Sequence, residues 1–219
     1  NSIAHRYDFL NHFLSAGVDH YWRRRAVDEL VAAKPRRILD VATGTADLAI
    51  AALRTDPEHI TGIDISEGML SVGRQKLVER HLADRITLEQ GDSEALRFAD
   101  DTFDAITAAY GVRNFEHLDR GLAEMRRVLR PGGKLVILEF SKPRAFPLKQ
   151  MYNGYFRFIL PQFGRLISKD ASAYTYLPES VQAFPDGEAF LDHLRGAGFR
   201  QVRWQPLTFG ISSLYTATT

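Results

Sequence analysis

The chain has 219 residues, 45% of them hydrophobic and 25% charged, which predicts one soluble α/β domain and leaves little room for a second. Its 28 Lys and Arg residues nearly equal its 27 Asp and Glu residues, so the overall charge does not indicate a nucleic acid partner. The chain contains no cysteine, which excludes disulfides, thiolate metal sites and thiol nucleophiles and is typical of a reducing compartment.

The N-terminal part of the chain is predicted to be helical. The sequence begins at Asn1 without a methionine, so we expect that some of the native N-terminus is missing. Apolar side chains recur at three- to four-residue spacing over residues 7–33 and stop at Lys34-Pro35, which predicts an N-terminal helical cap over residues 1–34. No apolar run approaches the roughly 18 residues of a membrane-spanning helix and no signal peptide is visible, so we expect a cytoplasmic protein.

A strand, a small-residue turn and a helix follow, and they are the most informative part of the sequence. The pattern predicts a strand over 36–41, a helix over 45–54 and a second strand over 60–64. Asp64 ends the second strand 20 residues after Gly44, a spacing typical of a nucleoside site at the carboxyl edge of a doubly wound sheet. The turn has alanine on both sides of its single glycine, at Ala42 and Ala46. The three-glycine dinucleotide fingerprint is therefore absent, and a pyrophosphate ligand is disfavoured.

Two acidic residues at successive strand ends are candidates for binding the nucleoside. Asp64 offers two acceptor oxygens to the ribose hydroxyls, or alternatively caps the next helix close to Ser66. Asp92 follows the third strand and can accept the adenine amino group, with the Ser93 amide at a ring nitrogen; alternatively Asp92 is an ordinary turn residue. The turn after the first strand, Asp64 after the second and Asp92 after the third all fit a nucleoside site, and their joint occurrence favours it over the alternatives.

The rest of the pattern alternates strands with helices, which predicts a parallel sheet. The expected elements are a helix over 67–81 that begins after Ser66, strands over 86–90 and 103–109, a helix over 118–129, a turn over 130–133, a strand over 134–140, a helix over 186–196 and strands over 199–205 and 209–217. The last two strands are joined by a short loop, so we expect them to pair as an antiparallel hairpin.

The turn and the strand ends resemble those of class I S-adenosylmethionine methyltransferases. The segments that carry this likeness are Asp40-x-Ala42-x-Gly44-Thr45, Asp64, Gly91-Asp92-Ser93 and Arg130-Pro131-Gly132-Gly133. Four further segments are similar to the menaquinone/ubiquinone-biosynthesis C-methyltransferase family: Tyr7-Asp8-Phe9-Leu10-Asn11 with Ser15, Gly17 and Trp22; Tyr110-Gly111-Val112-Arg113-Asn114; Leu138-Glu139-Phe140-Ser141-Lys142-Pro143; and Tyr174 with Tyr176-Leu177-Pro178-Glu179-Ser180-Val181 and Phe184-Pro185. The resemblance spans residues 4–217. This chain departs from the family at Ala46, where glycine is usual, and at Ala109, where serine is frequent.

The resemblance implies the fold and the cofactor. The fold is a Rossmann-like, doubly wound α/β sheet of seven strands, mostly parallel with an antiparallel last strand, in a single domain over 1–219 with a helical lid inserted at 142–185. The implied cofactor is S-adenosylmethionine. The residues carried over as cofactor contacts are Thr45, Asp64, Asp92 and Ser93, and the candidate cofactor site also includes Gly44, Ala42 and Ala109. No metal site is expected, and a homodimer is left open.

The implied substrate is a polyprenylated demethyl quinol. We favour the 1,4-naphthoquinol of menaquinone synthesis, with methylation of the ubiquinone-pathway benzoquinol as well as the alternative. Because a prenyl tail is insoluble, the enzyme must meet its substrate at a membrane surface, here the inner face of the cell membrane. Residues 142–169 carry six basic residues, several aromatic ones and no acid, which suits a lid in peripheral contact with anionic headgroups. The alternative is an ordinary packed helix with a solvated basic face.

The chemistry requires an activated aromatic carbon. Ionising the neighbouring quinol hydroxyl pushes charge onto that carbon, so the site must favour a phenolate. Arg113 and Asn114 follow the fourth strand at the predicted cleft, and we assign Arg113 to stabilising the oxyanion and Asn114 to orienting the hydroxyl or a water, with Tyr7 closing the network. The alternative for Arg113 is a salt bridge that pins its loop. His117 is interpreted as an exposed residue at a helix start, and no general base is assigned.

Two other classes of function remain as alternatives. A nicotinamide-dependent oxidoreductase also places an acid at the end of the second strand, but the missing glycines and the presence of Asp92 disfavour it. A non-catalytic cofactor-binding subunit of a quinone-synthesis complex is disfavoured by the intact Arg113-Asn114 loop.

Overall fold

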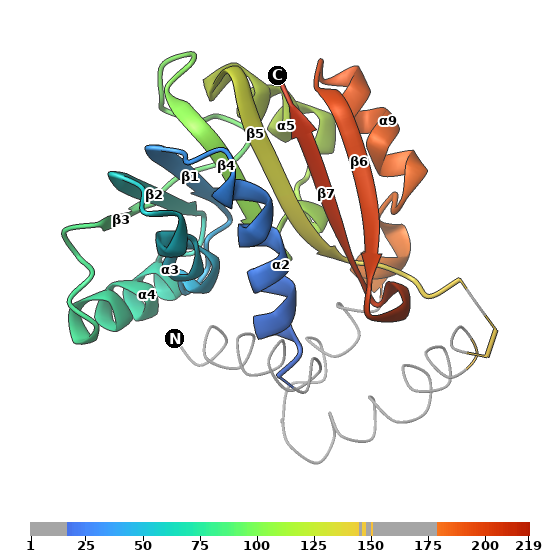
Figure 1. Cartoon of the computed structure of the whole chain (residues 1–219), viewed down its shortest axis with the longest axis horizontal. Coiled ribbons are helices and arrows are strands. Elements are labelled where there is room, and N and C mark those ends of the chain that lie inside the picture. The colour runs from blue at the N-terminus through green and yellow to red at the C-terminus, as the bar shows by residue number, and fades with distance from the viewer. Residues whose placement is uncertain (1–16, 145, 148–149, 151–178) are drawn as a thin grey trace.

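A single seven-stranded sheet dominates the fold (Figure 1). The computed structural model describes residues 17–144, 146–147, 150 and 179–219. In these residues the strands are β1 (Arg37–Val41), β2 (His59–Asp64), β3 (Ile86–Gln90), β4 (Phe103–Ala109), β5 (Leu129–Phe140), β6 (Arg200–Leu207) and β7 (Ser212–Thr218). The helices are α2 (Asp19–Val31), α3 (Asp47–Ala52), α4 (Glu67–Glu79), α5 (Leu118–Val128) and α9 (Glu188–Gly196).

The strand order is β3-β2-β1-β4-β5-β7-β6. The pairs from β3 across to β5 are parallel, whereas β7 runs antiparallel to both β5 and β6. The expected mostly parallel sheet and the terminal antiparallel hairpin are both confirmed. The chain leaves β1 toward β2 on one side and returns to β4 on the other, so the strand order reverses at β1 and β4. Such a switch point leaves a crevice at the carboxyl ends of the strands.

Hydrophobic side chains cover both faces of the sheet. Ile38 and Leu39 are adjacent in β1 and fully buried, yet they belong to different core clusters because successive strand side chains point to opposite faces. The cluster around Ile38 includes side chains of α2, α3 and α4, and the cluster around Leu39 includes side chains of α5 and α9. Figure 1 shows these helices flanking the sheet as a doubly wound fold requires.

Most predicted boundaries agree with the structure to within a few residues, and Ser66 caps α4 by accepting a hydrogen bond from the Met69 amide. One prediction was wrong: residues 130–133 do not separate α5 from the fifth strand. They lie inside β5, where the pairing with β4 shifts from Phe103↔Leu129 to Ala105↔Lys134. The extra residues form an irregularity in a continuous strand, which sequence periodicity does not distinguish from a turn.

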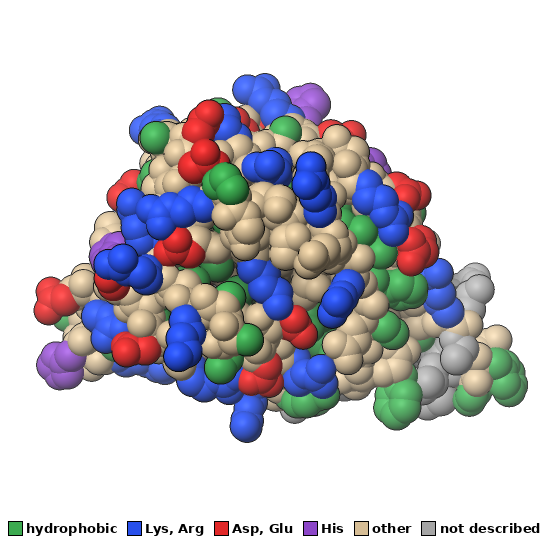
Figure 2. All heavy atoms as spheres, turned by 45° about the horizontal axis from the view of Figure 1, so that its top comes forward, with side chains coloured by type: hydrophobic (Ala, Val, Ile, Leu, Met, Phe, Trp, Pro, Cys, Tyr) green, Lys and Arg blue, Asp and Glu red, His purple; other side chains and the backbone are tan. Residues whose placement is uncertain are grey.

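The predicted helix before residue 17, with Tyr7, and most of the predicted lid lie outside the described residues. Within the part that the structure describes, no helix is long and apolar enough to cross a membrane. Basic and acidic side chains are interspersed over the face shown in Figure 2. Ion pairs near the amino ends of the strands include Arg36 with Glu58 and Lys134 with Glu29.

Candidate functional site

A pocket of about 770 Å³ lies at the carboxyl ends of the parallel strands. Its size is within the range of small-molecule sites. Its walls come from the segments that follow β1, β2, β3 and β4, as the switch-point geometry predicts. The sequence-predicted residues that line it are Ala42, Gly44, Thr45, Asp64, Asp92, Ser93, Ala109 and Asn114. The structure therefore brings together eight candidates drawn from four separate strand ends.

The turn after β1 adopts a left-handed backbone at three positions. The φ angles are 53° at Ala42, 57° at Gly44 and 69° at Ala46. Glycine adopts this conformation without strain, whereas an alanine there costs about 1–2 kcal/mol. Thr45, between the last two, is buried, and its hydroxyl lies 3.0 Å from the Lys76 ammonium.

Ala46→Gly is expected to raise the free energy of unfolding by up to about 1 kcal/mol, because relief of the left-handed strain exceeds the added entropy of the unfolded chain. Urea denaturation measures the change. Ala51→Gly, in the right-handed helix α3, is the matched control and should lower stability by about 1 kcal/mol. Equal losses in both variants would contradict the strain at Ala46.

Asp64 at the end of β2 is held in place by backbone amides. Its Oδ2 accepts from the Gly44 N–H at 2.8 Å and its Oδ1 from the Ser66 N–H at 2.9 Å. The helix cap itself is the Ser66 hydroxyl, so the capping role considered for Asp64 belongs to its neighbour. Burial raises the pKa of the Asp64 carboxyl, and the amide hydrogen bonds oppose that rise. Each carboxylate oxygen keeps a second lone pair, which leaves acceptors for a ligand diol.

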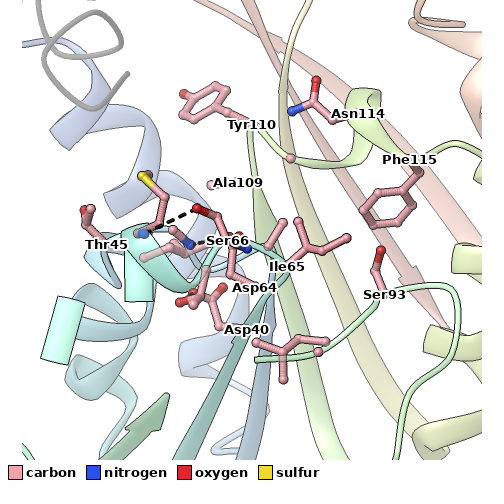
Figure 3. Close-up of a pocket in the computed structure, with 18 of the residues that line it drawn as sticks. Asp40, Thr45, Asp64, Ile65, Ser66, Ser93, Ala109, Tyr110, Asn114 and Phe115 are labelled. Atoms are coloured by element: carbon pink, nitrogen blue, oxygen red, sulfur yellow. Dashed lines mark hydrogen bonds between the residues drawn. The ribbon is translucent and has the colours of Figure 1, made fainter. Parts of the chain in front are cut away.

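Two apolar side chains line the part of the pocket near Ser93. Neither was predicted from the sequence. Ile65 follows Asp64 and is 74% exposed although it is aliphatic, and Phe115 lies in the loop after β4. Figure 3 shows both near Ser93, on the same side of Asp64. The sequence signal that could have indicated Ile65 is its position as an aliphatic residue directly after the acid that ends β2. Together these side chains suit the faces of a flat aromatic ring.

Asp92 has one oxygen engaged in its own turn. Its Oδ1 accepts from the Glu94 N–H at 2.8 Å, which is the turn geometry considered as the alternative to ligand binding. The residue is nevertheless exposed and lines the pocket beside Ser93. The turn engages only Oδ1 of Asp92, so the same carboxylate can hold its turn and also face a ligand in the pocket.

Asp40 lines the pocket, and no role was predicted for it from the sequence. It lies in β1, is 1% exposed, and its two oxygens accept from the Thr43 and Thr107 hydroxyls, each at 2.6 Å. Burial raises the pKa of its carboxyl to about 6, since it outweighs those hydrogen bonds and the nearby Asp64 adds to the rise. The signal missed in the sequence was an acid among the apolar residues Ile38, Leu39 and Val41 of a buried strand.

The Asp40 shift predicts a pH dependence of stability. Because the pKa rises from 3.8 unfolded to about 6 folded, this group stabilises the fold fully below about pH 4 and loses that contribution as pH rises through 6. The loss is on the order of 3 kcal/mol. Asp40→Asn removes the titration, so its stability relative to the wild type should improve between pH 4 and 7 in urea unfolding. A difference that stays constant with pH would contradict the shift.

Arg113, proposed from the sequence to stabilise the oxyanion, is not among the described residues that line the pocket. Its side chain is fully buried, and Nη1 lies 2.7 Å from Oε1 of Glu139, a fully buried carboxylate in β5. Nε donates to the Ser180 hydroxyl at 3.3 Å, and Nη1 also contacts the Tyr110 carbonyl. The salt bridge considered as the alternative is therefore present, and the role of Arg113 at the oxyanion stays a prediction. Asn114, next in that loop, is exposed and lines the pocket (Figure 3).

His117 lies at the start of α5 and outside the pocket lining. Its side chain is 63% exposed and its Nδ1 lies 2.9 Å from Glu94 Oε2. This agrees with the interpretation of an exposed residue at a helix start. Within the described part of the chain, no group of three or more His, Asp or Glu side chains could hold a metal ion.

Comparison with known sequences identifies close relatives over the whole chain. The model of the ubiE/COQ5 methyltransferase family matches residues 1–219. Demethylmenaquinone methyltransferase of Bacteroides fragilis is 52% identical over 219 residues, which cover 100% of this chain and 89% of the relative. The ubiquinone/menaquinone biosynthesis C-methyltransferase UbiE of Geobacter sulfurreducens is 48% identical over 99% of this chain and 85% of its own length.

Solved structures share the fold at much lower identity. A putative S-adenosyl-L-methionine-dependent methyltransferase from Methanococcus maripaludis has a TM-score of 0.69 at 18% identity, over 99% of this chain and 91% of that one. The [4+2]-cyclase SpnF has a TM-score of 0.66 at 22% identity, over 90% and 80% of the two chains. The names of these two proteins differ in chemistry, so the structural likeness bears on the fold alone.

Proposed function

The chain belongs to the ubiE/COQ5 methyltransferase family, and from that membership we infer that it is an S-adenosylmethionine-dependent C-methyltransferase that converts a demethylmenaquinol into menaquinol. The observation that carries this function is identity of 46–52% to demethylmenaquinone methyltransferases over 98–100% of the chain. The pocket supports it, since four strand ends supply the groups that an adenosine ligand requires.

We propose that Asp64 binds the ribose hydroxyls, because its two oxygens are fixed by the Gly44 and Ser66 amides and keep acceptor capacity. The adenine then lies toward Ile65 and Phe115, with Asp92 and Ser93 at its edge. When bound, S-adenosylmethionine supplies an electrophilic methyl group on a sulfonium. The chain's own contribution is to hold that group and to orient the quinol.

Asn114 is the described residue that we propose for orienting the quinol hydroxyl. It is exposed on the pocket wall, and its loop is fixed from behind by the buried Arg113–Glu139 pair. Its amide can donate to a developing oxyanion or hold a water beside it. Arg113 thereby acts as a positioning residue for Asn114. The participation of Tyr7 stays a prediction from the sequence.

The acceptor is tested by offering two quinols side by side. Methyl transfer from radiolabelled S-adenosylmethionine is measured with short-chain demethylmenaquinol and with the demethyl benzoquinol. Label in the naphthoquinol alone is the expected result. Label in both would favour the dual-pathway alternative, which the name of the Geobacter relative also carries. No label in either, with cofactor binding intact, would favour the non-catalytic subunit.

We further propose that residues 142–169 meet the membrane in which a prenylated quinol is dissolved. Phe146 is 82% exposed at the start of this segment. Lys142 and Arg144 precede it, but both pair with Asp186, at 3.8 and 3.3 Å, so the charges of these two residues are partly neutralised. The basic residues farther along the segment must then supply most of the attraction to anionic headgroups.

Replacing Lys149, Arg157, Arg165 and Lys169 with glutamine is expected to reduce pelleting with anionic vesicles, because each basic residue near the surface contributes about 1 kcal/mol. The Asp186 pairs remain intact in this variant. Co-sedimentation at low and high salt measures binding, with vesicles of zwitterionic lipid as the control. Unchanged pelleting would exclude the electrostatic contact and favour a packed helix with a solvated basic face.

A further inference from the structure

Charged side chains wall the end of the pocket that lies away from Ser93. In Figure 3, Thr45 stands on the opposite side of Asp64 from Ser93 and Phe115. At this end the lining includes Arg23 of α2 and Asp47, the first residue of α3. No role was predicted for either residue from the sequence.

Arg23 and Asp47 form adjacent opposite charges, each supported from behind by a counter-charge. Arg23 Nη2 lies 3.7 Å from Asp47 Oδ2, which is beyond hydrogen-bond distance. Asp19 binds Arg23 through Nη1, and Lys76 lies 2.7 Å from Asp47 Oδ1. Asp19 and Lys76 do not line the pocket. The four groups sum to zero net charge, but the pocket wall presents one positive and one negative group side by side.

Such an array is poorly explained by stability alone. Arg23 is only 7% exposed, and taking ion pairs out of water costs about as much as their attraction returns. The hydrogen bond to Asp19 uses only part of the five-donor guanidinium fork, which therefore retains donors for a carboxylate. A ligand with a single charge would be attracted by one of the two wall residues and repelled by the other. A ligand group that carries a carboxylate and an ammonium together matches both.

We propose that Arg23 and Asp47 bind the α-amino-acid end of the cofactor, with Arg23 at its carboxylate and Asp47 at its ammonium. This inference rests on the proposed function, since it extends the same ligand from Asp64 toward α2. It assigns the N-terminal helix α2 a part in selecting the complete cofactor over a nucleoside that lacks the amino acid. Asp19 and Lys76 act as positioning residues that hold the two wall charges in place.

The test compares two ligands that differ only at that end. S-adenosylhomocysteine carries the amino-acid group, whereas 5′-methylthioadenosine has the same nucleoside and sulfur without it. Isothermal titration calorimetry gives both dissociation constants for the wild type, for Arg23→Gln and for Asp19→Asn/Arg23→Gln. The double variant is included because Arg23→Gln alone removes the guanidinium that the buried Asp19 carboxylate contacts. Arg24→Gln, an exposed arginine on the same helix, is the matched control.

Both Arg23 variants should bind S-adenosylhomocysteine about 10–100-fold more weakly, the loss expected for a charged hydrogen-bonded contact, and methylthioadenosine within about twofold of the wild type. Arg24→Gln should change neither constant. Equal losses for both ligands, or no loss for either, would overturn the assignment and leave Arg23 a structural residue of α2. A wild type that binds neither ligand would instead contradict the cofactor itself.

Discussion

Arg113→Ala is expected to lower the free energy of unfolding by about 3–5 kcal/mol, because it leaves the fully buried Glu139 carboxylate without its counter-charge. The loop after β4 also loses the contact of Arg113 with the Tyr110 carbonyl and its packing over the Phe140 ring, whose centroid is 5.4 Å from the guanidinium carbon. Urea denaturation measures the stability, and calorimetry with S-adenosylhomocysteine measures the cofactor affinity. Both should fall.

A paired variant separates the charge from the packing. Arg113→Met/Glu139→Gln removes both charges while keeping side chains of similar size, so it should recover much of the stability that Arg113→Ala loses. Arg113→Lys keeps a charge but not the planar fork. A stable Arg113→Ala protein that binds cofactor normally and has lost only turnover would contradict the structural role. That outcome would return Arg113 to direct stabilisation of the oxyanion.

Asp64→Asn is expected to weaken cofactor binding by about 10²–10⁴-fold. Two charged hydrogen bonds to a ribose diol contribute about 1.5–3 kcal/mol each, and every 1.4 kcal/mol is a factor of ten. The asparagine can offer only one acceptor oxygen, so it also loses either the Gly44 or the Ser66 amide that orients the group. The dissociation constant of S-adenosylhomocysteine is the direct measurement.

The control for Asp64→Asn is Asp84→Asn, which changes an exposed acid outside the pocket in the same way and should leave binding unchanged. Thermal melting without ligand shows whether the turn after β1 has collapsed. A folded Asp64→Asn protein with wild-type affinity would show that Asp64 only fixes the loop, and would remove the ribose contact from the proposed site.

The sequence predicted the sheet well because its information is local. Apolar periods locate strands such as β1 and β2, and short connections force their carboxyl ends to one edge, so Gly44, Asp64 and Asp92 could be placed together before any coordinates. The residues 130–133 were misplaced because a proline–glycine segment reads as a turn whether it ends a strand or interrupts one.

The roles of charged residues were harder to predict because their partners are distant in the sequence. Arg113 and Glu139 are 26 residues apart, and their buried ion pair keeps the Arg113 side chain out of the pocket lining. Asn114, one residue later, faces the pocket instead. The sequence places Arg113 and Asn114 in the same loop, but it does not show that Arg113 pairs with the buried Glu139 carboxylate. Arg23 was missed for the same reason, since only the packing of α2 brings it near Asp47.

The most direct test of the proposed function is to find where the methyl group goes. The protein is incubated with S-adenosylmethionine that carries a trideuterated methyl group and with reduced, short-chain demethylmenaquinone, and the product is examined by mass spectrometry and NMR. We predict that the deuterated methyl appears on the quinol ring carbon and that S-adenosylhomocysteine forms in equal amount. Label on a quinol oxygen, or cofactor turnover without a methylated ring, would contradict C-methylation as the reaction of this protein.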